Sequence, residues 1–422
     1  MGIKSQVQSI KFFLYNNLMS KQSARLALSW MIRILFSFFH RLIYWKRYQR
    51  VYSVNVALIT YPRYLSLSRI FLNEFFLHMG RVFDESNTKW VLIFHPYSAR
   101  SKTSWHHNGI FIEYLVLSPN ILLSLVTQFF KDQILSNSKI KKSFFDIVVE
   151  HTWNAFFAKS PLKNLIGMGL QGQFAKIAHF NDRLVFEIEH GIPPAGFSAT
   201  FNHFTFDERA DCYLVWHEHY MRHYNLENQP RGILLGYPNR ETNSKKTKNR
   251  ISVLIGLTVD HPPLWDPWGL LTHEIKFAIE RCLELGYLVQ LRLHPFSTQD
   301  ISIGPKSKPT FKSINSFFRE IFPNISSISH PHYVSVYEEI DNSDLVIAQG
   351  TLAFNAVARG TPAVIFSQQE NSPDLPPEFL KSGSVFLTSF DDFGLNCKKA
   401  LGKKINVQLK GLTSEFVLHL KP

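Results

Sequence analysis

The fold of this chain is decided by residues 343–353, which have the sequence SDLVIAQGTLA. The apolar run at residues 345–348 has the length of a buried β-strand, and Gly350 ends it. A helical pattern, TLAFNAVARG, begins at once, with Thr351 at or near its first position. A strand that passes directly into a helix predicts an α/β unit, and PAVIF at residues 362–366 supplies the next strand.

The same alternation extends towards the N-terminus of this stretch. RISVLIGL (250–257) predicts a strand, HEIKFAIERCLELG (273–286) a helix that ends at a glycine, and YLVQLRLHP (287–295) the next strand. Because parallel strands need helical crossovers that bury both faces of the sheet, this half predicts a doubly wound parallel sheet.

The first half of the chain shows a second series of apolar runs. WVLIFHP, FDIVVEHTW, RLVFEIEHG and GILLGYP predict strands, and CYLVWHEHYMRHY predicts a strand that continues as a helix; they occupy residues 90–96, 145–153, 183–191, 232–238 and 212–224. Between the two series lies ETNSKKTKNR (241–250), which is polar, cationic and without apolar periodicity, as in a linker. We therefore predict an α/β protein with two Rossmann-like domains, at residues 89–240 and 251–400, and a C-terminal tail at 401–422.

Residues 1–88 predict a basic, aromatic and helical region, which could be part of the first domain. The apolar stretch at residues 27–45 contains Arg33, His40 and Arg41, which argues against a membrane-spanning helix. Its flanking lysines and arginines suit an amphipathic helix at an anionic membrane surface, and a core helix with cationic edges remains the alternative. The formal charge of +13 also calls for anionic partners, without choosing among them.

The three cysteines, Cys212, Cys282 and Cys397, are odd in number and far apart. They predict neither a disulfide framework nor a cysteine-based zinc site, so we expect a cytoplasmic protein.

Ligands of doubly wound sheets bind beyond the carboxyl ends of the strands, so the residues there are the candidate site residues. The first group is Glu187, Glu189, His190 and Gly191. Alternation places the two carboxylates on one face of a strand and the imidazole on the other, which predicts a general base near a backbone that substrate can approach. The alternative is an edge strand with solvated carboxylates.

The second group is Arg292, His294 and Pro295. Alternation lets Arg292 and His294 face one anion, such as a phosphate. Of the four His-Pro pairs in the sequence we select His294, because it alone follows a predicted strand in the second half.

The third group is Gly350 with Thr351, where a strand passes into a helix. The free N–H groups and the dipole of a helix start favour phosphate, and the alternative is an ordinary capped helix.

His219 and His223 have the i, i+4 spacing of a zinc-binding helix, which raises the alternative of a zinc site. Tyr220 stands where the HExxH motif needs Glu, so we interpret these residues as a polar helix face and expect no metal.

The three groups resemble the motifs of bacterial GT-B enzymes of capsule, lipooligosaccharide and teichoic-acid assembly. That group includes CDP-glycerol glycerophosphotransferase-like proteins, capsule polysaccharide transferases and bacterial sialyltransferases. The resembling segments are Glu189-His190-Gly191, His294-Pro295 and Gly350-Thr351, within residues 185–366.

The resemblance implies a GT-B fold with two domains facing a cleft, and an inverting glycosyltransferase that needs no metal and no cofactor. Glu189 or His190 would be the base, while His294 and the amides near Gly350 and Thr351 would stabilise the leaving nucleotide. It further implies a nucleotide-sugar donor, a cell-surface polysaccharide or lipid-linked glycan acceptor, and a peripheral place on the cytoplasmic side of the inner membrane.

Two other functions stay open at this point. A nucleotide-sugar epimerase can use the same two-domain scaffold. A non-enzymatic basic protein could bind lipid or nucleic acid, although the lysines and arginines are scattered and no nucleic-acid module is present, so we expect no nucleic-acid partner.

Overall fold

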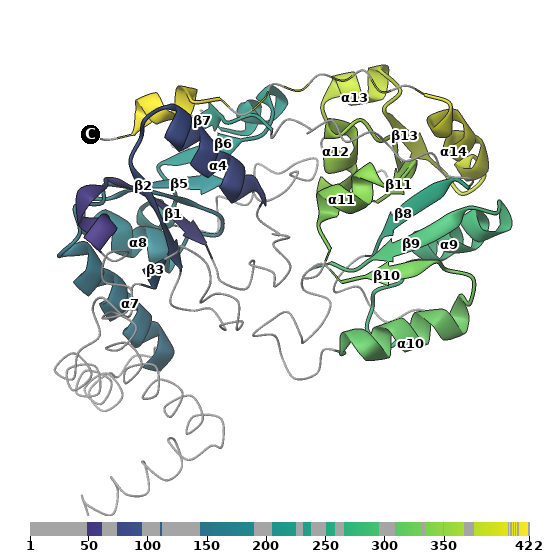
Figure 1. Cartoon of the computed structure of the whole chain (residues 1–422), viewed down its shortest axis with the longest axis horizontal. Helices are drawn as coiled ribbons and strands as arrows, with labels where there is room; N and C mark the ends of the chain where they lie inside the picture. The colour runs from purple at the N-terminus through teal and green to yellow at the C-terminus, as the bar shows by residue number, and fades with distance from the viewer. Residues whose placement is uncertain are drawn as a thin grey trace, which may run out of the picture. The chain divides into compact units, whose positions relative to one another are not determined.

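A computed structural model describes most of the chain (Figure 1). The described residues are 49–60, 74–94, 110–111, 144–189, 205–224, 231–237, 250–257, 266–294, 309–330, 334–348, 350–366, 375–403, 405, 407, 409, 411 and 413–420. By its internal contacts the chain divides into two compact units, residues 1–53 with 110–161 and residues 54–109 with 162–422.

The described part of the first unit includes α7 (Phe144–Phe157). Its buried rings pack on one another, with the centroids of Trp153 and Phe157 5.2 Å apart. The prediction of a strand at residues 145–153 was wrong, because a short apolar run does not distinguish a strand from a buried helix. The buried positions Val149, Trp153, Phe156 and Phe157 have helical spacing.

A seven-stranded sheet has the order β3-β2-β1-β4-β5-β6-β7, and its strands other than β3 belong to the second unit. Its strands are β1 (Val56–Thr60), β2 (Trp90–Phe94), β3 (Ile110–Phe111), β4 (Asn164–Gly167), β5 (Leu184–Ile188), β6 (Cys212–Val215) and β7 (Arg231–Leu234). The pairings from β2 to β7 are parallel. The strand order reverses between β1 and β4, so that pair marks the switch point of this sheet.

A six-stranded sheet follows in the order β10-β9-β8-β11-β12-β13, and all its pairings are parallel. Its strands are β8 (Ser252–Gly256), β9 (Leu288–Arg292), β10 (Ser327–Ser329), β11 (Leu345–Ile347), β12 (Ala363–Phe366) and β13 (Val385–Thr388). Here the switch point lies between β8 and β11. The predicted α/β class with two doubly wound sheets is confirmed.

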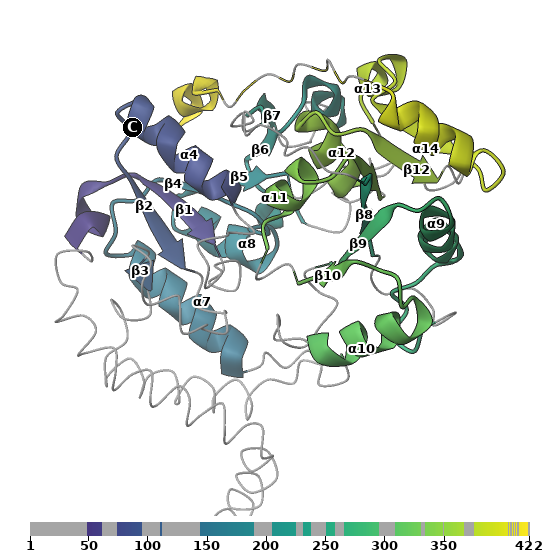
Figure 2. The same ribbon diagram turned by 45° about the vertical axis from the view of Figure 1, so that its right-hand side comes forward.

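Helices cover both faces of the second sheet (Figures 1 and 2). One face packs on α9 (His273–Glu284), α10 (Phe311–Ile321) and α14 (Phe393–Leu401). On the other face α12 (Thr351–Ala358) contacts β11 and β12, and α11 (Val336–Asp341) contacts α12.

The remaining helices of the second unit are shorter or lie near the first sheet. They are α4 (Glu74–Glu85), α8 (Gln173–Phe180), α13 (Pro377–Lys381) and the 3-10 helices η5 (Phe206–Glu208), η6 (Glu218–His223) and η7 (Glu415–His419); a further one, η1 (Arg50–Ser53), belongs to the first unit.

Several strands were not identified from sequence. The region at 1–88, which was expected to be helical, also contributes a strand, because β1 lies there and pairs inside the first sheet between β2 and β4. The short strands β4, β10 and β13 were also missed, since three or four residues hold too little periodicity. The stretch at 27–45 and nearly all of the linker at 241–250 lie outside the described residues. No helix in the described part of the chain is long and apolar enough to cross a membrane.

Candidate functional site

The carboxylates at the end of β5 are buried. This strand lies between β4 and β6, so it is not an edge strand. Glu187 is 4% exposed and Glu189 5% exposed, which excludes the alternative of solvated carboxylates. His190 and Gly191, which were predicted beside them, lie outside the described residues.

Glu187 holds a glycine-rich loop. Its Oε1 accepts a hydrogen bond from the N–H of Gly169 at 2.5 Å, and its Oε2 accepts one from the N–H of Leu170 at 2.7 Å. Burial raises the pKa of Glu187 from 4.5 to about 8, against the lowering effect of the two backbone donors. Both carboxylate oxygens of Glu187 accept hydrogen bonds from this loop, so the side chain supports the loop. This arrangement differs from the prediction that Glu187 binds substrate.

This loop was missed in the sequence, although its pattern could have revealed it. Residues 167–172 read GMGLQG, with the G-x-G-x-x-G spacing of phosphate-binding turns, between β4 and α8. A Cβ on Gly167 would lie 2.4 Å from the carbonyl oxygen of Ile59, so the glycine allows β1 and β4 to pair. Two amides of this loop are turned to Glu187, which removes them from the donors that could receive an external phosphate.

Glu189 is tied to the end of the neighbouring strand. Its Oε2 accepts a hydrogen bond from the N–H of Trp216 at 3.1 Å, just beyond β6. This contact sets the position of the carboxylate and also of the Trp216 backbone.

Aromatic side chains continue from Trp216 to the second sheet. The ring of Trp216 lies 5.8 Å from that of Phe354 in α12, and the ring of Tyr237 lies 5.6 Å from it. The Tyr237 hydroxyl donates a buried hydrogen bond of 2.6 Å to Oδ1 of Asn355. The residues beyond β6 and β7 are thereby joined to α12, three or four residues after its start.

The start of α12 lies at the switch point of the second sheet. Gly350 is its N-cap, with a φ of 61° that L side chains rarely adopt, and Thr351 is its first residue. A Cβ on Gly256, the last residue of β8, would lie 2.7 Å from Leu352 Cδ2 and 3.2 Å from the Cβ of Ala348. Gly256 therefore lets the first turn of α12 come close to the end of β8, where ligands of such sheets bind.

The end of β9 separates the two residues that were predicted to share an anion. Arg292 is 5% exposed and forms an ion pair with Glu339, whereas His294 is exposed. The prediction that Arg292 faces the anion beside His294 therefore differs from the structure, because a buried guanidinium requires an internal partner. Pro295 lies outside the described residues.

His294 is not alone in following a strand of the second half, which corrects the selection made from sequence. His330 follows β10, which pairs with β9, and it is also followed by proline. His330 is only 3% exposed and lies edge-on to Phe311, with ring centroids 5.0 Å apart. Of these two histidines, His294 is the one that solvent and ligands can reach.

The histidines after β6 serve local structure. They lie on a 3-10 helix, so the i, i+4 face of an α-helical zinc site does not form. Nδ1 of His217 accepts the N–H of His219 at 3.1 Å, and its Nε2 lies 2.9 Å from Oε1 of Glu378. Burial lowers the pKa of His217. Within the described residues no group of three or more His, Cys, Asp or Glu is arranged to hold a metal ion.

The topology brings His294, Gly350 and Thr351 to one edge of the second sheet. They follow β9 and β11, which flank β8 on its two sides. Glu189 belongs to the corresponding edge of the first sheet and is connected to α12 through Trp216 and Phe354. A carboxylate and a helix N-terminus are the components needed for proton transfer and phosphate binding.

No model of a protein family matches this sequence, and no curated protein matches it. Among solved structures, one similar protein is a mutant of TarM from S. aureus in complex with UDP, with 10% identity over 82% of this chain and 92% of that chain and a TM-score of 0.47. The wall teichoic acid polymerase TagF has 11% identity over 88% of each chain and a TM-score of 0.45. UDP-GlcNAc 2-epimerase of Methanocaldococcus jannaschii has 14% identity over 86% of this chain and 98% of that chain, with a TM-score of 0.46. Likenesses at this level do not establish an activity, so function has to be inferred from the residues.

Proposed function

We propose that this chain is a glycosyltransferase that moves a sugar from a nucleotide-activated donor to a glycan acceptor, with inversion and without a metal. The observation that carries the proposal is the connection from Glu189 through Trp216 to Phe354 on α12. It joins a buried carboxylate to the helix whose N-terminus can bind a phosphate, as a single transfer site requires.

The donor phosphates would lie at the switch point of the second sheet. The first amides of α12 and the exposed His294 provide hydrogen-bond donors there, and the helix dipole favours the negative charge of a departing nucleotide. Donors fixed by the fold can neutralise this charge as a metal ion would, so the mechanism does not call for a metal.

The acceptor hydroxyl would be activated at the end of β5. Glu189 or His190 takes the proton of the hydroxyl, and its oxygen attacks the anomeric carbon of the donor. The bond from that carbon to the phosphate oxygen breaks on the opposite face, and the electron pair leaves with the nucleotide. One displacement of this kind inverts the configuration of the sugar.

The finer parts of the proposal concern acceptor and location. A cell-surface polysaccharide or a lipid-linked glycan as acceptor, and a peripheral position on the inner membrane, agree with the cationic balance of +13. Thermal-shift measurements with CMP, CDP, UDP and GDP would identify the nucleotide, and a lipid-vesicle sedimentation assay would test the membrane contact.

The decisive experiment is His294→Ala, assayed with the nucleotide sugar that the screen identifies. Because His294 is exposed, we expect the fold to remain and transfer to fall by about 100-fold or more. Lys381→Ala is the matched control, since that side chain is also exposed and ends α13, on the segment that leads into the start of β13. Near-normal turnover in His294→Ala would refute the phosphate assignment.

Glu189→Ala and His190→Ala, compared side by side, identify the base. The variant that lacks the base should lose at least about 100-fold in the rate of transfer. Incubation of the donor without acceptor distinguishes a glycosyltransferase from an epimerase, because only an epimerase would return an isomerised nucleotide sugar.

A further inference from the structure

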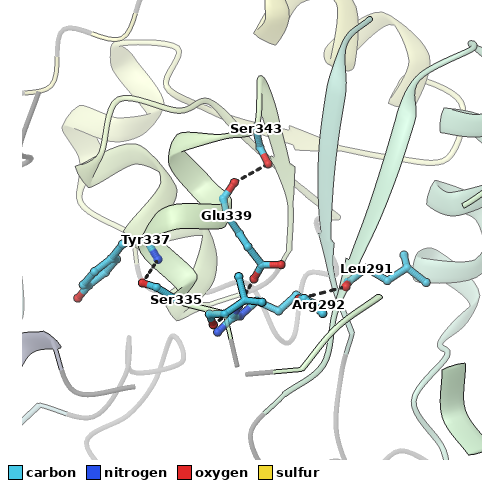
Figure 3. Close-up of polar contacts among 8 residues, drawn as sticks. Leu291, Arg292, Ser335, Tyr337, Glu339 and Ser343 are labelled. Carbon is cyan, nitrogen blue, oxygen red and sulfur yellow. Dashed lines mark hydrogen bonds and ion pairs between the residues drawn. The ribbon is translucent and has the colours of Figure 1, made fainter. Parts of the chain in front are cut away.

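A buried ion pair is formed by Arg292, which precedes His294 by two residues. Nη1 of Arg292, the last residue of β9, pairs with Oε2 of Glu339 in α11 (Figure 3). Arg292 is 5% exposed and Glu339 is 7% exposed. The same nitrogen donates to the carbonyl oxygen of Val334 at 3.2 Å, so this nitrogen of the guanidinium contacts both α11 and the segment before it.

This ion pair connects two parts of the sheet whose strands, β9 and β11, do not pair with each other. His294 follows β9, Thr351 follows β11, and β8 lies between these two strands. Arg292 reaches from β9 to α11, and the hydroxyl of Ser343 donates to the carbonyl oxygen of Glu339 at 2.7 Å, immediately before β11. α11 also contacts α12. The ion pair thus links the strand of His294 to the strand and helix that place Thr351.

Arg292 is also well placed to hold the chain that carries His294. Leu293, between them, is 1% exposed, so two consecutive buried side chains precede the exposed histidine. A buried ion pair gains little stability over an apolar pair of the same size, but its fixed donor and acceptor directions define geometry. Its presence here is therefore best explained by the position it imposes.

We infer that Arg292 and Glu339 are positioning residues of the proposed donor site. Their ion pair holds His294 at a fixed place relative to the first turn of α12, so that imidazole and helix amides meet the same phosphate. The expected effect on transfer rests on the proposed function, whereas the expected effect on the position of His294 does not.

The test replaces the whole pair, because loss of one partner leaves a buried charge and can unfold the protein. The pair variant is Arg292→Met with Glu339→Leu. The matched control is Arg359→Met with Asp341→Leu, which removes a second ion pair from the same unit, 2.9 Å between Arg359 Nε and Asp341 Oδ1. That pair joins α11 to the C-terminal end of α12, far along the helix from Thr351.

We expect both variants to melt near the melting temperature of the wild type. The pair variant should bind the nucleoside diphosphate about tenfold more weakly and lower kcat by about tenfold, as expected for a displaced contact group. The control should stay within about twofold on both measures. Adding the pair variant to His294→Ala should cause little loss beyond that of His294→Ala alone, because residues that act through one another are not additive.

Wild-type kinetics in a folded pair variant, or an additive loss with His294→Ala, would overturn the inference. Should the pair variant fail to fold, Glu339→Gln serves instead, since it retains an acceptor for the guanidinium while removing the charge. It should raise KM for the donor, and an unchanged KM would count against the inference.

If the wild type shows neither nucleotide binding nor transfer, the proposed function itself fails. In that case NMR of 13C-labelled histidine still tests whether the ion pair positions His294. The His294 signals, assigned with His294→Ala, should move in the pair variant and stay in the control. Unmoved signals would reject the positioning role whatever the enzyme does.

Discussion

The buried carboxyl group of Glu187 predicts a particular dependence of stability on pH. Its pKa in the folded chain is raised from 4.5 to about 8, chiefly by burial. Between these two pH values the folded chain therefore holds a proton that the unfolded chain has released. The contribution of the Glu187 carboxyl group to the free energy of unfolding is fully present below pH 4.5 and is lost as the pH rises towards 8. The largest possible decline is about 5 kcal/mol, at about 1.4 kcal/mol for each pKa unit.

The variant Glu187→Gln removes this titration. Its amide nitrogen faces one of the N–H groups of Gly169 and Leu170, so one buried donor loses its acceptor at a cost of about 1–3 kcal/mol. At pH 5 we expect the variant to be less stable than wild type by that amount. By pH 9 the difference should vanish or reverse, because only the wild type has lost stability.

Urea unfolding at pH 5, 7 and 9 measures the difference, and hydrogen exchange at residues 167–172 reports on the loop itself. Glu284→Gln is the control, since it makes the same substitution at an exposed carboxylate. A constant difference between wild type and Glu187→Gln from pH 5 to pH 9 would refute the reasoning.

Three further outcomes follow from the site. Tyr237→Phe leaves Oδ1 of Asn355 without its donor and should lower stability by about 1–3 kcal/mol in urea unfolding; an unchanged midpoint would show that the contact contributes nothing. Gly256→Ala places a Cβ against Leu352, so it should cost about 1–3 kcal/mol and weaken nucleotide binding in calorimetry, whereas wild-type affinity would contradict the place given to α12. Transfer measured after treatment with EDTA should proceed at the untreated rate, and a loss restored by a divalent cation would contradict the metal-free mechanism.

Much of the candidate site was predictable because strand ends carry their own signals. The apolar run before Gly350 and the helical pattern after Thr351 predict a strand-to-helix turn, and the structure places α12 there. The run that ends in Glu187 and Glu189 predicts a strand, which is β5. These are local features, set by side-chain alternation and by glycine, so they can be recognised one segment at a time.

The partners of the charged residues were not predictable in this way. Arg292 was expected to face an anion, and only the packing of α11 shows that Glu339 neutralises it. Glu187 was expected to bind substrate, and only the pairing of β4 with β5 turns the amides of Gly169 and Leu170 towards it.

By itself, the sequence of this protein determined the alternation of strands and helices, and with it the class of fold, because hydrophobic periodicity is written along the chain. Tertiary structure alone decided which strand is central, which histidine is exposed and which charges are satisfied internally. Those properties depend on residues far apart in the sequence, such as Tyr237 and Asn355 at 118 positions, whose contact is created only when the strands and helices pack.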